Sequence, residues 1–173
     1  QNICEIVNAA ALCDSFIRID MEDSSCTSAE IMLFKRLKNS FPNRVGLVLQ
    51  AYLRRTSDDI IELLQLHYNH SPLNIRLCKG IYIEDESISF KDPQEIRDHY
   101  IDDLNVLLRN GVYVGIATHD KYLIDKTFEL IDQMKYSPAQ YEFQMLYGVT
   151  PGLGRSVLEK GHRMRIYVPF GKE

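Results

Sequence analysis

Short apolar segments alternate with longer amphipathic segments along the chain. Successive short segments begin 29, 30, 37, 29 and 23 positions apart, which leaves room for one helix between each pair. This spacing predicts repeated strand–helix units, and therefore a parallel sheet with right-handed crossovers. Six segments have the length and the Val, Ile, Leu and aromatic content of buried strands: 16–19, 45–49, 75–78, 112–117, 141–146 and 164–168.

Helix-start signals lie between these predicted strands. Residues 27–30 (Thr-Ser-Ala-Glu) form a capping-box pattern before an apolar stretch. Residues 56–59 (Thr-Ser-Asp-Asp) place two carboxylates in a first helical turn, where the helix dipole favours negative charge. Asp92, followed by proline, predicts the N-cap of a helix that stops near Gly111. Asp120 predicts a further N-cap.

Polar or reactive residues follow nearly every predicted strand. Because the carboxyl ends of parallel strands meet at one edge of a sheet, these side chains are expected to share a ligand-binding face. The regular repeat favours a (β/α)8 barrel, of which about six units are present, over a doubly wound sheet, and no GxGxxG fingerprint follows the first strand. The strand-end residues are Asp20, Glu22, Gln50, Tyr52, Lys79, Tyr82, Thr118, His119, Gln144 and Tyr167.

Three charged residues near these ends have both a chemical and a structural interpretation. The Asp20 carboxylate can orient a hydroxyl, take up a proton or bind a cation, or it can cap the following helix. Arg76 interrupts an apolar strand, so it needs an acceptor, either on a ligand or on a carboxylate inside the barrel. Lys79 lies three residues further and would face the opposite side of a regular strand. Gly80 beside it permits close approach of a ligand to the backbone.

His119 and Tyr167 are also open to two interpretations. A histidine in this setting is more often a satisfied polar residue than a metal ligand. Tyr167 can stack on a planar ligand or simply pack inside a barrel. The four cysteines include no CxxC pair and have no histidine beside them at metal-ligand spacing. We therefore predict no metal site, and we expect reduced thiols in a reducing compartment.

The composition contributes mainly by exclusion. Of the 173 residues, 45% are hydrophobic and 25% are charged, which is typical of a globular domain and not of a disordered or collagen-like chain. The formal net charge of −4 gives no general attraction to nucleic acid. No apolar run approaches the roughly 18 residues that a membrane helix needs. A single globular domain that does not bind nucleic acid is expected.

Six segments that carry the strand-end residues resemble, in chain order, the flavin-dependent proline dehydrogenases. They are RIDMED, GLVLQAYLRRT, IRLCKGIYIED, GIATHD, YEFQMLYG and RIYVPFG, and the resemblance spans residues 16–171. It implies a distorted (β/α)8 barrel that carries FAD, with these segments as its third to eighth strands. Residues 1–173 are then expected to be a partial barrel domain, without its first strands and its last helix.

The resemblance also implies an activity. The family oxidises L-proline to 1-pyrroline-5-carboxylate by hydride transfer from proline C5 to flavin N5, which is the first step of proline catabolism. The reduced flavin is then reoxidised, typically by a membrane quinone. For this chain we therefore expect FAD as cofactor and a quinone as electron acceptor. The implied location is the cytoplasm, with peripheral contact to the inner membrane as an option, on the matrix side in a eukaryote.

Roles for the strand-end residues follow from the same resemblance. Arg76 and Gln50 are expected to hydrogen-bond the isoalloxazine ring, where positive charge helps the ring to accept electrons. Tyr167 is expected to cover the proline ring, with its hydroxyl held by Asp20. Asp20, Arg76 and Tyr167 are the expected catalytic residues. The rest of the FAD site is expected to comprise Lys79, Gly80, Thr118, His119 and Gln144.

Some family features differ in this chain or lie outside it. Tyr82 and Leu146 are the expected further walls of the substrate pocket. The family commonly has Asn after the ATH triplet, where this chain has Asp120. The family's pair of adjacent arginines on the last helix and its substrate lysine on an early strand have no counterpart in residues 1–173, because Arg54-Arg55 follows a different strand. The chain by itself is therefore expected to bind proline weakly.

Two other functions are compatible with parts of the pattern. A Schiff-base lyase or aldolase would use Lys79 as its nucleophile at a barrel strand end, and a yellow, FAD-bearing protein would argue against it. A degenerate barrel kept as a partner-binding module is the non-enzymatic alternative. The complete strand-end set speaks against that alternative, because packing alone does not require Gln50, Arg76, Lys79 and His119 together.

Overall fold

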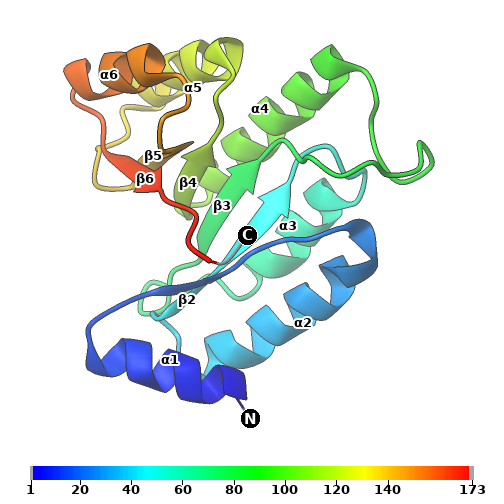
Figure 1. The fold of residues 1–173 in the computed structure, drawn as a ribbon, viewed down its shortest axis with the longest axis vertical. Coiled ribbons are helices and arrows are strands. Elements are labelled where there is room, and N and C mark those ends of the chain that lie inside the picture. The colour runs from blue at the N-terminus through cyan, green and yellow to red at the C-terminus, as the bar shows by residue number, and fades with distance from the viewer. Residues whose placement is uncertain (1, 172–173) are drawn as a thin grey trace.

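The computed structural model describes residues 2–171 (Figure 1). Within them, helices and strands alternate as the apolar pattern predicts, and each predicted strand is present to within one residue at either end. The strands are β1 (Ile17–Ile19), β2 (Val45–Gln50), β3 (Asn74–Cys78), β4 (Tyr113–Ala117), β5 (Tyr141–Leu146) and β6 (Met164–Tyr167). The helices are α1 (Asn2–Leu12), α2 (Ser24–Ser40), α3 (Thr56–Leu64), α4 (Pro93–Arg109), α5 (Lys121–Met134) and α6 (Pro151–Glu159).

One parallel sheet contains all six strands of the described residues, in the order β1-β2-β3-β4-β5-β6. Each strand pairs with the next strand along the chain, so the strand order never reverses. A doubly wound sheet reverses its order at a switch point, whereas a barrel does not. The curled sheet with its helices (Figure 1) confirms the predicted barrel-type α/β fold, with six parallel strands in the described residues.

The apolar core lies between the sheet and the helices. Leu47 of β2 and Phe143 of β5 are fully buried in this core, together with the aliphatic residues at alternate strand positions. The residues between them face the other, concave side of the sheet, which is polar. There Arg18 donates a hydrogen bond of 2.6 Å to the side chain of Asn74. The sheet therefore separates an apolar layer under the helices from a polar interior.

Three of the predicted helix boundaries are confirmed. Asp92 accepts hydrogen bonds of 2.9 Å from two backbone N–H groups in the first turn of α4. Asp120 caps α5 in the same way, through one N–H group at 3.0 Å. Gly111 follows the end of α4 with a φ of +75°, a conformation that favours glycine. These local signals needed no tertiary information.

The predicted start of α2 is wrong. The helix begins at Ser24, and its N-cap is Asp23, which accepts a hydrogen bond from a first-turn backbone N–H group at 2.9 Å. Thr27 is therefore inside the helix and buried. Glu84, which is distant in sequence, also accepts hydrogen bonds from the Ser24 backbone N–H and hydroxyl, at 2.6 and 2.7 Å.

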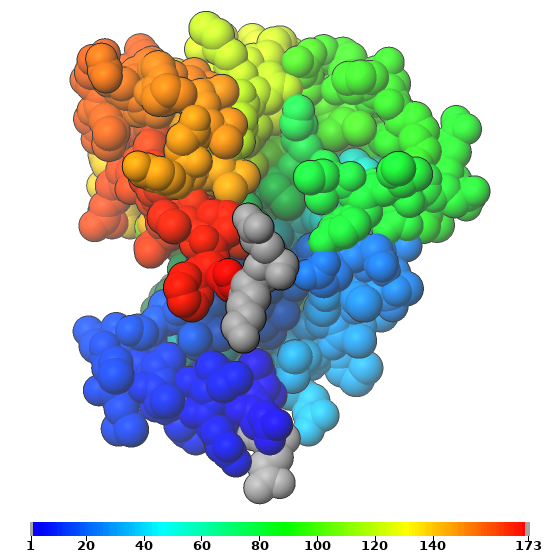
Figure 2. All heavy atoms as spheres, in the orientation of Figure 1, coloured from blue at the N-terminus to red at the C-terminus, as the bar shows by residue number. Residues whose placement is uncertain are grey.

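The start and the end of the described chain meet on the concave side. Residues 14–16, Arg18 and residues 165–168 line one cavity there, and Figure 2 shows the N-terminal and C-terminal segments side by side on this face. No helix in residues 2–171 combines the length and the apolar character needed to cross a membrane.

Candidate active site

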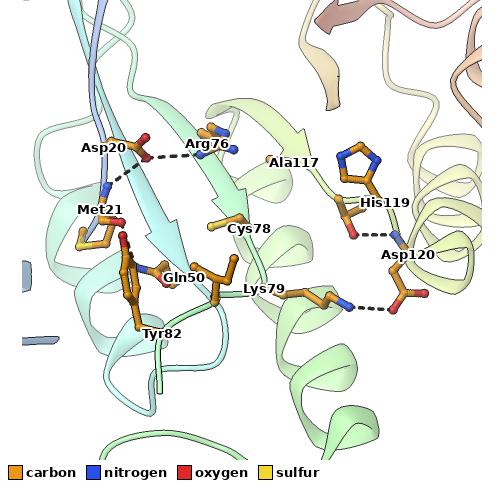
Figure 3. Close-up of a pocket in the computed structure, with 13 residues that line it drawn as sticks. Asp20, Met21, Gln50, Arg76, Cys78, Lys79, Tyr82, Ala117, His119 and Asp120 are labelled. Atoms are coloured by element: carbon orange, nitrogen blue, oxygen red, sulfur yellow. Dashed lines mark hydrogen bonds and ion pairs between the residues drawn. The ribbon is translucent and has the colours of Figure 1, made fainter. Parts of the chain in front are cut away.

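A cavity of about 500 Å³ lies at the carboxyl ends of β1 to β4 (Figure 3). Its volume falls in the range of small-molecule sites, roughly 300–1,000 Å³. Its wall consists of the last residues of these strands and of the loops that follow them. The lining residues are Asp20, Met21, Gln50, Arg76, Cys78, Lys79, Gly80, Ile81, Tyr82, Ala117, Thr118, His119 and Asp120.

Two further cavities share residues with the first, and Arg76 lines all three. Gln144 and Tyr167 line both of these cavities, and Leu146 lines the smaller one. The fold therefore brings every residue predicted for the site to the same end of the sheet. It divides them into a group around the first cavity and a group near β5 and β6.

Arg76 links the two groups. Its Nη1 lies 3.4 Å from Asp20 Oδ1, which also accepts a hydrogen bond of 3.1 Å from the Met21 backbone N–H. On its other side, the guanidinium lies 6.0 Å from the centre of the Tyr167 ring. The expectation was a hydrogen bond from the Tyr167 hydroxyl to Asp20. In this structure the connection between these two residues runs through Arg76 instead.

Lys79 belongs to an ion cluster at the edge of the cavity. Strand β3 ends at Cys78, so strand alternation does not determine the direction of Lys79, and both Arg76 and Lys79 line the cavity. Lys79 Nζ donates to Asp120 Oδ2 at 3.1 Å, and Arg97 Nε donates to the same oxygen at 2.9 Å. Figure 3 shows Lys79 directed toward Asp120.

The Asp120 carboxylate is the centre of this cluster, with a side chain only 7% exposed. Burial alone would raise the pKa of Asp120, but the hydrogen bonds from Arg97 and Lys79 outweigh it, and the pKa lies below its ordinary value. An Asn at this position would present a neutral oxygen to the two cations. Asp120 therefore forms a charge-paired anchor for Lys79.

Gln50 is buried, and its amide has a defined orientation. The amide Nε2 donates to the backbone oxygens of Met21 and Glu22, at 3.2 and 2.7 Å. Both partners are acceptors only, so the nitrogen must face them. The Oε1 atom is left as the group that Gln50 can offer to a ligand as an acceptor.

The loops that follow β1 and β3 are joined across the cavity. The Tyr82 hydroxyl donates to the Glu22 carboxylate, and Glu84 holds the start of α2 at Ser24. The hydrogen bond to Glu22 raises the pKa of Tyr82 to about 12. Glu22, whose role the sequence left open, therefore holds Tyr82 at the wall of the cavity.

Gly80 has a φ of +110°, which residues with a side chain rarely adopt. A Cβ atom at this position would lie 2.0 Å from the ring of Tyr52. We expected the glycine to allow a ligand close to the backbone. The structure adds another reason, because the buried Tyr52 ring packs directly against Gly80.

The two ring nitrogens of His119 both have partners. Nε2 lies 3.1 Å from the backbone N–H of Leu146, and Nδ1 lies 2.8 Å from Thr150 Oγ1. Burial lowers the pKa of His119. Beside it, the Thr118 hydroxyl accepts a hydrogen bond of 3.1 Å from the Asp120 backbone N–H. His119 thus connects the end of β4 with the end of β5.

Gln144 and several residues that sequence reasoning missed complete the surroundings. Gln144 Nε2 donates to Glu142 Oε1 at 2.7 Å, and Arg165 donates to both oxygens of Glu142, at 2.7 and 3.0 Å. Arg97, in the first half of α4, and Thr150, before α6, contact the site through other side chains. No strand-end pattern could identify Arg97 or Thr150, although the Thr-Pro sequence at 150–151 is a helix-start signal.

Comparison with known proteins identifies the family. The family model for proline dehydrogenase matches residues 2–173. Proline dehydrogenase 1 of Bacillus subtilis (strain 168) is 34% identical over 168 residues, which cover 97% of this chain and 54% of that protein. Proline dehydrogenase of Deinococcus radiodurans is 32% identical over 173 residues, covering 99% of this chain and 54% of that protein. The chain spans about half the length of these curated relatives.

Solved structures show the same fold. Proline utilization A (PutA) from Bdellovibrio bacteriovorus, inactivated by N-propargylglycine, superposes with a TM-score of 0.85 and 28% identity, over 91% of this chain and 18% of that chain. A mutant PutA of Bradyrhizobium japonicum gives a TM-score of 0.84 at 20% identity, over 98% of this chain and 19% of that chain. Because the family model covers nearly the whole sequence, the chain belongs to the proline dehydrogenase family.

Proposed function

We propose that residues 1–173 are part of a flavin-dependent barrel domain, and that the protein containing them oxidises L-proline to 1-pyrroline-5-carboxylate. The observation that carries the proposal is the convergence of Arg76, Asp20, Gln50 and Tyr167 at the carboxyl end of one parallel sheet. Family membership supports the reaction, since relatives at 32% and 34% identity are named proline dehydrogenases.

The residues around Arg76 fit a flavin ring. Arg76 engages Asp20 through Nη1 alone, at 3.4 Å, so its remaining N–H groups are available to a ligand within the described contacts. The buried Gln50 adds a hydrogen-bond acceptor of fixed orientation. A fixed positive charge stabilises the negative charge that an isoalloxazine ring gains on reduction. When bound, FAD supplies the hydride acceptor, and this chain supplies charge and orientation.

We assign the remaining FAD contacts to a group of residues at the ends of β3, β4 and β5. Lys79 supports this assignment because its ammonium is held at the cavity edge by Asp120. Thr118 and Gln144 offer polar side chains there, and both line the small cavity next to Arg76. The assigned residues are Lys79, Gly80, Thr118, His119 and Gln144.

The substrate is proposed to lie beside Arg76, against Tyr167 and Leu146. These two residues occupy paired positions on adjacent strands, and their 47% and 39% exposure leaves apolar surface for a proline ring. Tyr82 provides a further wall, held by its hydroxyl. The Asp20 carboxylate is a nearby acceptor for the substrate ammonium. In this arrangement the chain orients the substrate and excludes water, which is a major source of catalysis.

We further propose a quinone as the electron acceptor, with a cytoplasmic location or peripheral contact with the inner membrane. The support for both is the resemblance to flavin-dependent proline dehydrogenases. The apolar side chains of Ile81 and Ile83, which are 85% and 100% exposed beside the first cavity, offer a surface that such contact could use.

The Schiff-base alternative is not favoured by the position of Lys79. A lysine nucleophile must attack as the neutral amine, whereas Lys79 donates to a buried carboxylate that is also bound by Arg97. Borohydride reduction in the presence of a carbonyl substrate is expected to leave Lys79 unlabelled. Labelling of Lys79 would favour the alternative.

A visible absorption spectrum of the full-length protein tests the proposal. We expect the flavin bands of bound FAD, and their loss when L-proline is added without oxygen. D-proline serves as the control, because a site built for one enantiomer does not orient the other. A protein that binds FAD but is not bleached by L-proline would contradict the proposed substrate.

The variant Arg76→Met tests the residue on which the site depends. Removing one pre-organised charge donor typically lowers the rate by about 100- to 1,000-fold, and we expect a loss of kcat/KM for L-proline in that range. Arg36→Met, an exposed position on α2, removes the same charge away from the cavities and is expected to leave kcat/KM unchanged. Equal effects of the two variants would contradict the role of Arg76.

A further inference from the structure

The hydrogen bonds of His119 determine its protonation. A backbone N–H group can only donate, so Nε2, at 3.1 Å from the Leu146 N–H, must be the acceptor and carries no proton. The ring proton therefore resides on Nδ1, which donates to Thr150 Oγ1 at 2.8 Å. The lowered pKa of His119, caused by burial, agrees with a neutral ring. Neither nitrogen is left to exchange a proton with a ligand.

Thr150 has an unusual backbone conformation for its residue type. Its φ of +46° and ψ of +55° lie in the left-handed region, which is unfavourable for a β-branched residue. It occupies the N-cap position of α6, yet its side chain makes no capping hydrogen bond to that helix. The hydroxyl is directed to His119 instead. The bond to His119 is therefore a reason for a conformation that the helix start does not require.

The contact between Thr150 and His119 bears on the position of Leu146 at the end of β5. His119 accepts a hydrogen bond from the Leu146 backbone N–H, and Leu146 is paired with Tyr167 on β6. The backbone N–H of Tyr147 donates to the backbone oxygen of Tyr167 at 2.9 Å. His119, Leu146 and Tyr167 line one small cavity together with Arg76. A displacement of Leu146 would thus move both walls proposed for the substrate.

We propose that Thr150 is a positioning residue that, through the neutral Nδ1-protonated ring of His119, fixes the Leu146 wall of the substrate pocket. The part concerning substrate rests on the proposed function, whereas the part concerning His119 and Leu146 does not. His119 then contributes the face of its ring to the cavity, and its two nitrogens serve to hold the loop between β5 and α6.

Thr150→Val is the decisive variant, measured in the full-length holoenzyme. Valine keeps the β-branch of threonine and replaces the hydroxyl with a methyl group, which cannot form a hydrogen bond. In the wild type, ¹⁵N shifts of the His119 imidazole are expected to report a proton on Nδ1. In the variant the Nδ1–H group loses its acceptor, so we expect the ¹⁵N signal of Nδ1 and the Leu146 amide signal both to shift. We also expect the KM for L-proline to rise about tenfold, as for one lost hydrogen bond, with a smaller change in kcat.

Two further variants control for a general loss of structure. Thr150→Ser retains the hydroxyl and is expected to keep the wild-type Nδ1 signal, the Leu146 signal and the KM. Thr27→Val removes a buried hydroxyl that has no hydrogen-bond partner among the described residues, and it is expected to change none of the three.

Each negative result would contradict a different part of the proposal. An unchanged Nδ1 signal in Thr150→Val would overturn the proposal, and so would a shifted Nδ1 signal with an unchanged Leu146 amide signal. An unchanged KM with both signals altered would overturn the link to the substrate wall. If the protein did not oxidise proline at all, the proposed function would fail, but the two NMR measurements would still decide whether Thr150 positions His119 and Leu146.

Discussion

Two buried carboxylates at different places in the molecule show how burial and charged partners change the pKa of an aspartate. Asp120, at the carboxyl end of β4, is bound by Lys79 and Arg97, and its pKa lies below the ordinary value. Asp103, in the helix layer, has a residue exposure of 2%, and within residues 2–171 its only hydrogen-bond partner is the Ser57 hydroxyl, at 2.7 Å. Burial raises the pKa of Asp103 to about 6.

The two carboxylates differ in whether positively charged side chains contact them. The strand ends of a parallel sheet gather side chains from several elements, so Asp120 receives donors from the end of β3 and from α4 at once. Asp103 faces α3, where Ser57 is its neighbour, and its Oδ2 has no hydrogen-bond partner among the described residues. A raised carboxylate pKa often marks a functional site. Here the carboxylate with the raised pKa is Asp103, which is not among the residues lining the cavity. The position of a carboxylate therefore identifies this site, and its pKa does not.

The largest expected effect on stability is that of Asp120→Ala. The change removes the N-cap of α5 and leaves two cations without their shared acceptor. A lost cap costs about 1 kcal/mol, and the two charge-assisted hydrogen bonds about 1 kcal/mol each. We expect the free energy of unfolding of the full-length protein to fall by about 3 kcal/mol in chemical denaturation at a fixed FAD concentration.

Asp125→Ala on the same helix is the matched control for that variant. Its ion pair with Lys121 is exposed, and exposed pairs contribute only about 0.5 kcal/mol. If both aspartate variants lowered stability equally, the charge cluster around Asp120 would not be the cause.

The contrast between local and distant partners also explains how far the sequence predicts the fold. The strands are predicted to within one residue because each coincides with a short apolar run in the sequence. The caps at Asp92 and Asp120 act within their own helices, so their signals are local. The start of α2 is held by the local cap at Asp23 and also by Glu84, 60 residues away from Ser24, and no local pattern contains the second contact.

The candidate site shows the same limit. Strand-end reasoning predicts which residues gather, because parallel strands must align their ends. It does not predict how they pair, because Asp120 with Arg97 and Tyr82 with Glu22 depend on loop geometry. Lys38 is a further example outside the site. It reads as an ordinary helix-end lysine, yet it is 3% exposed and donates to three backbone oxygens at 2.6 to 3.0 Å.

Asp103→Asn is expected to raise the free energy of unfolding, by less than Asp120→Ala lowers it. The folded-state pKa of about 6 exceeds the ordinary 3.8, so the folded protein binds more protons than the unfolded one between these values. Stability therefore falls as pH rises from about 4 to 6, and the penalty is complete at pH 7. Asn carries no charge, so the variant is expected to be more stable than the wild type by about 2 kcal/mol at pH 7.

The pH dependence distinguishes this cause from a change in packing. At pH 4 the folded wild type is already neutral at this position, so most of the difference between its unfolding midpoint and that of Asp103→Asn is expected to be lost. Denaturation curves at pH 4 and pH 7 provide the measurement. A stability gain of the same size at both pH values would show that the charge of Asp103 is not responsible.

The smallest expected effect is that of Ser57→Ala, which removes the hydroxyl that bonds to Asp103. The buried carboxylate then loses its donor, so the pKa of Asp103 is expected to rise further. One lost hydrogen bond corresponds to about 1 kcal/mol of stability at pH 7. Ser28→Ala, which removes an exposed hydroxyl on α2, is the control and is expected to be neutral.

Combining Ser57→Ala with Asp103→Asn makes the comparison sharper, because a neutral amide depends less on the hydroxyl than a carboxylate does. The effect of Ser57→Ala is therefore expected to be smaller in the Asp103→Asn background, and an undiminished effect there would mean that the serine acts through packing and not through the charge.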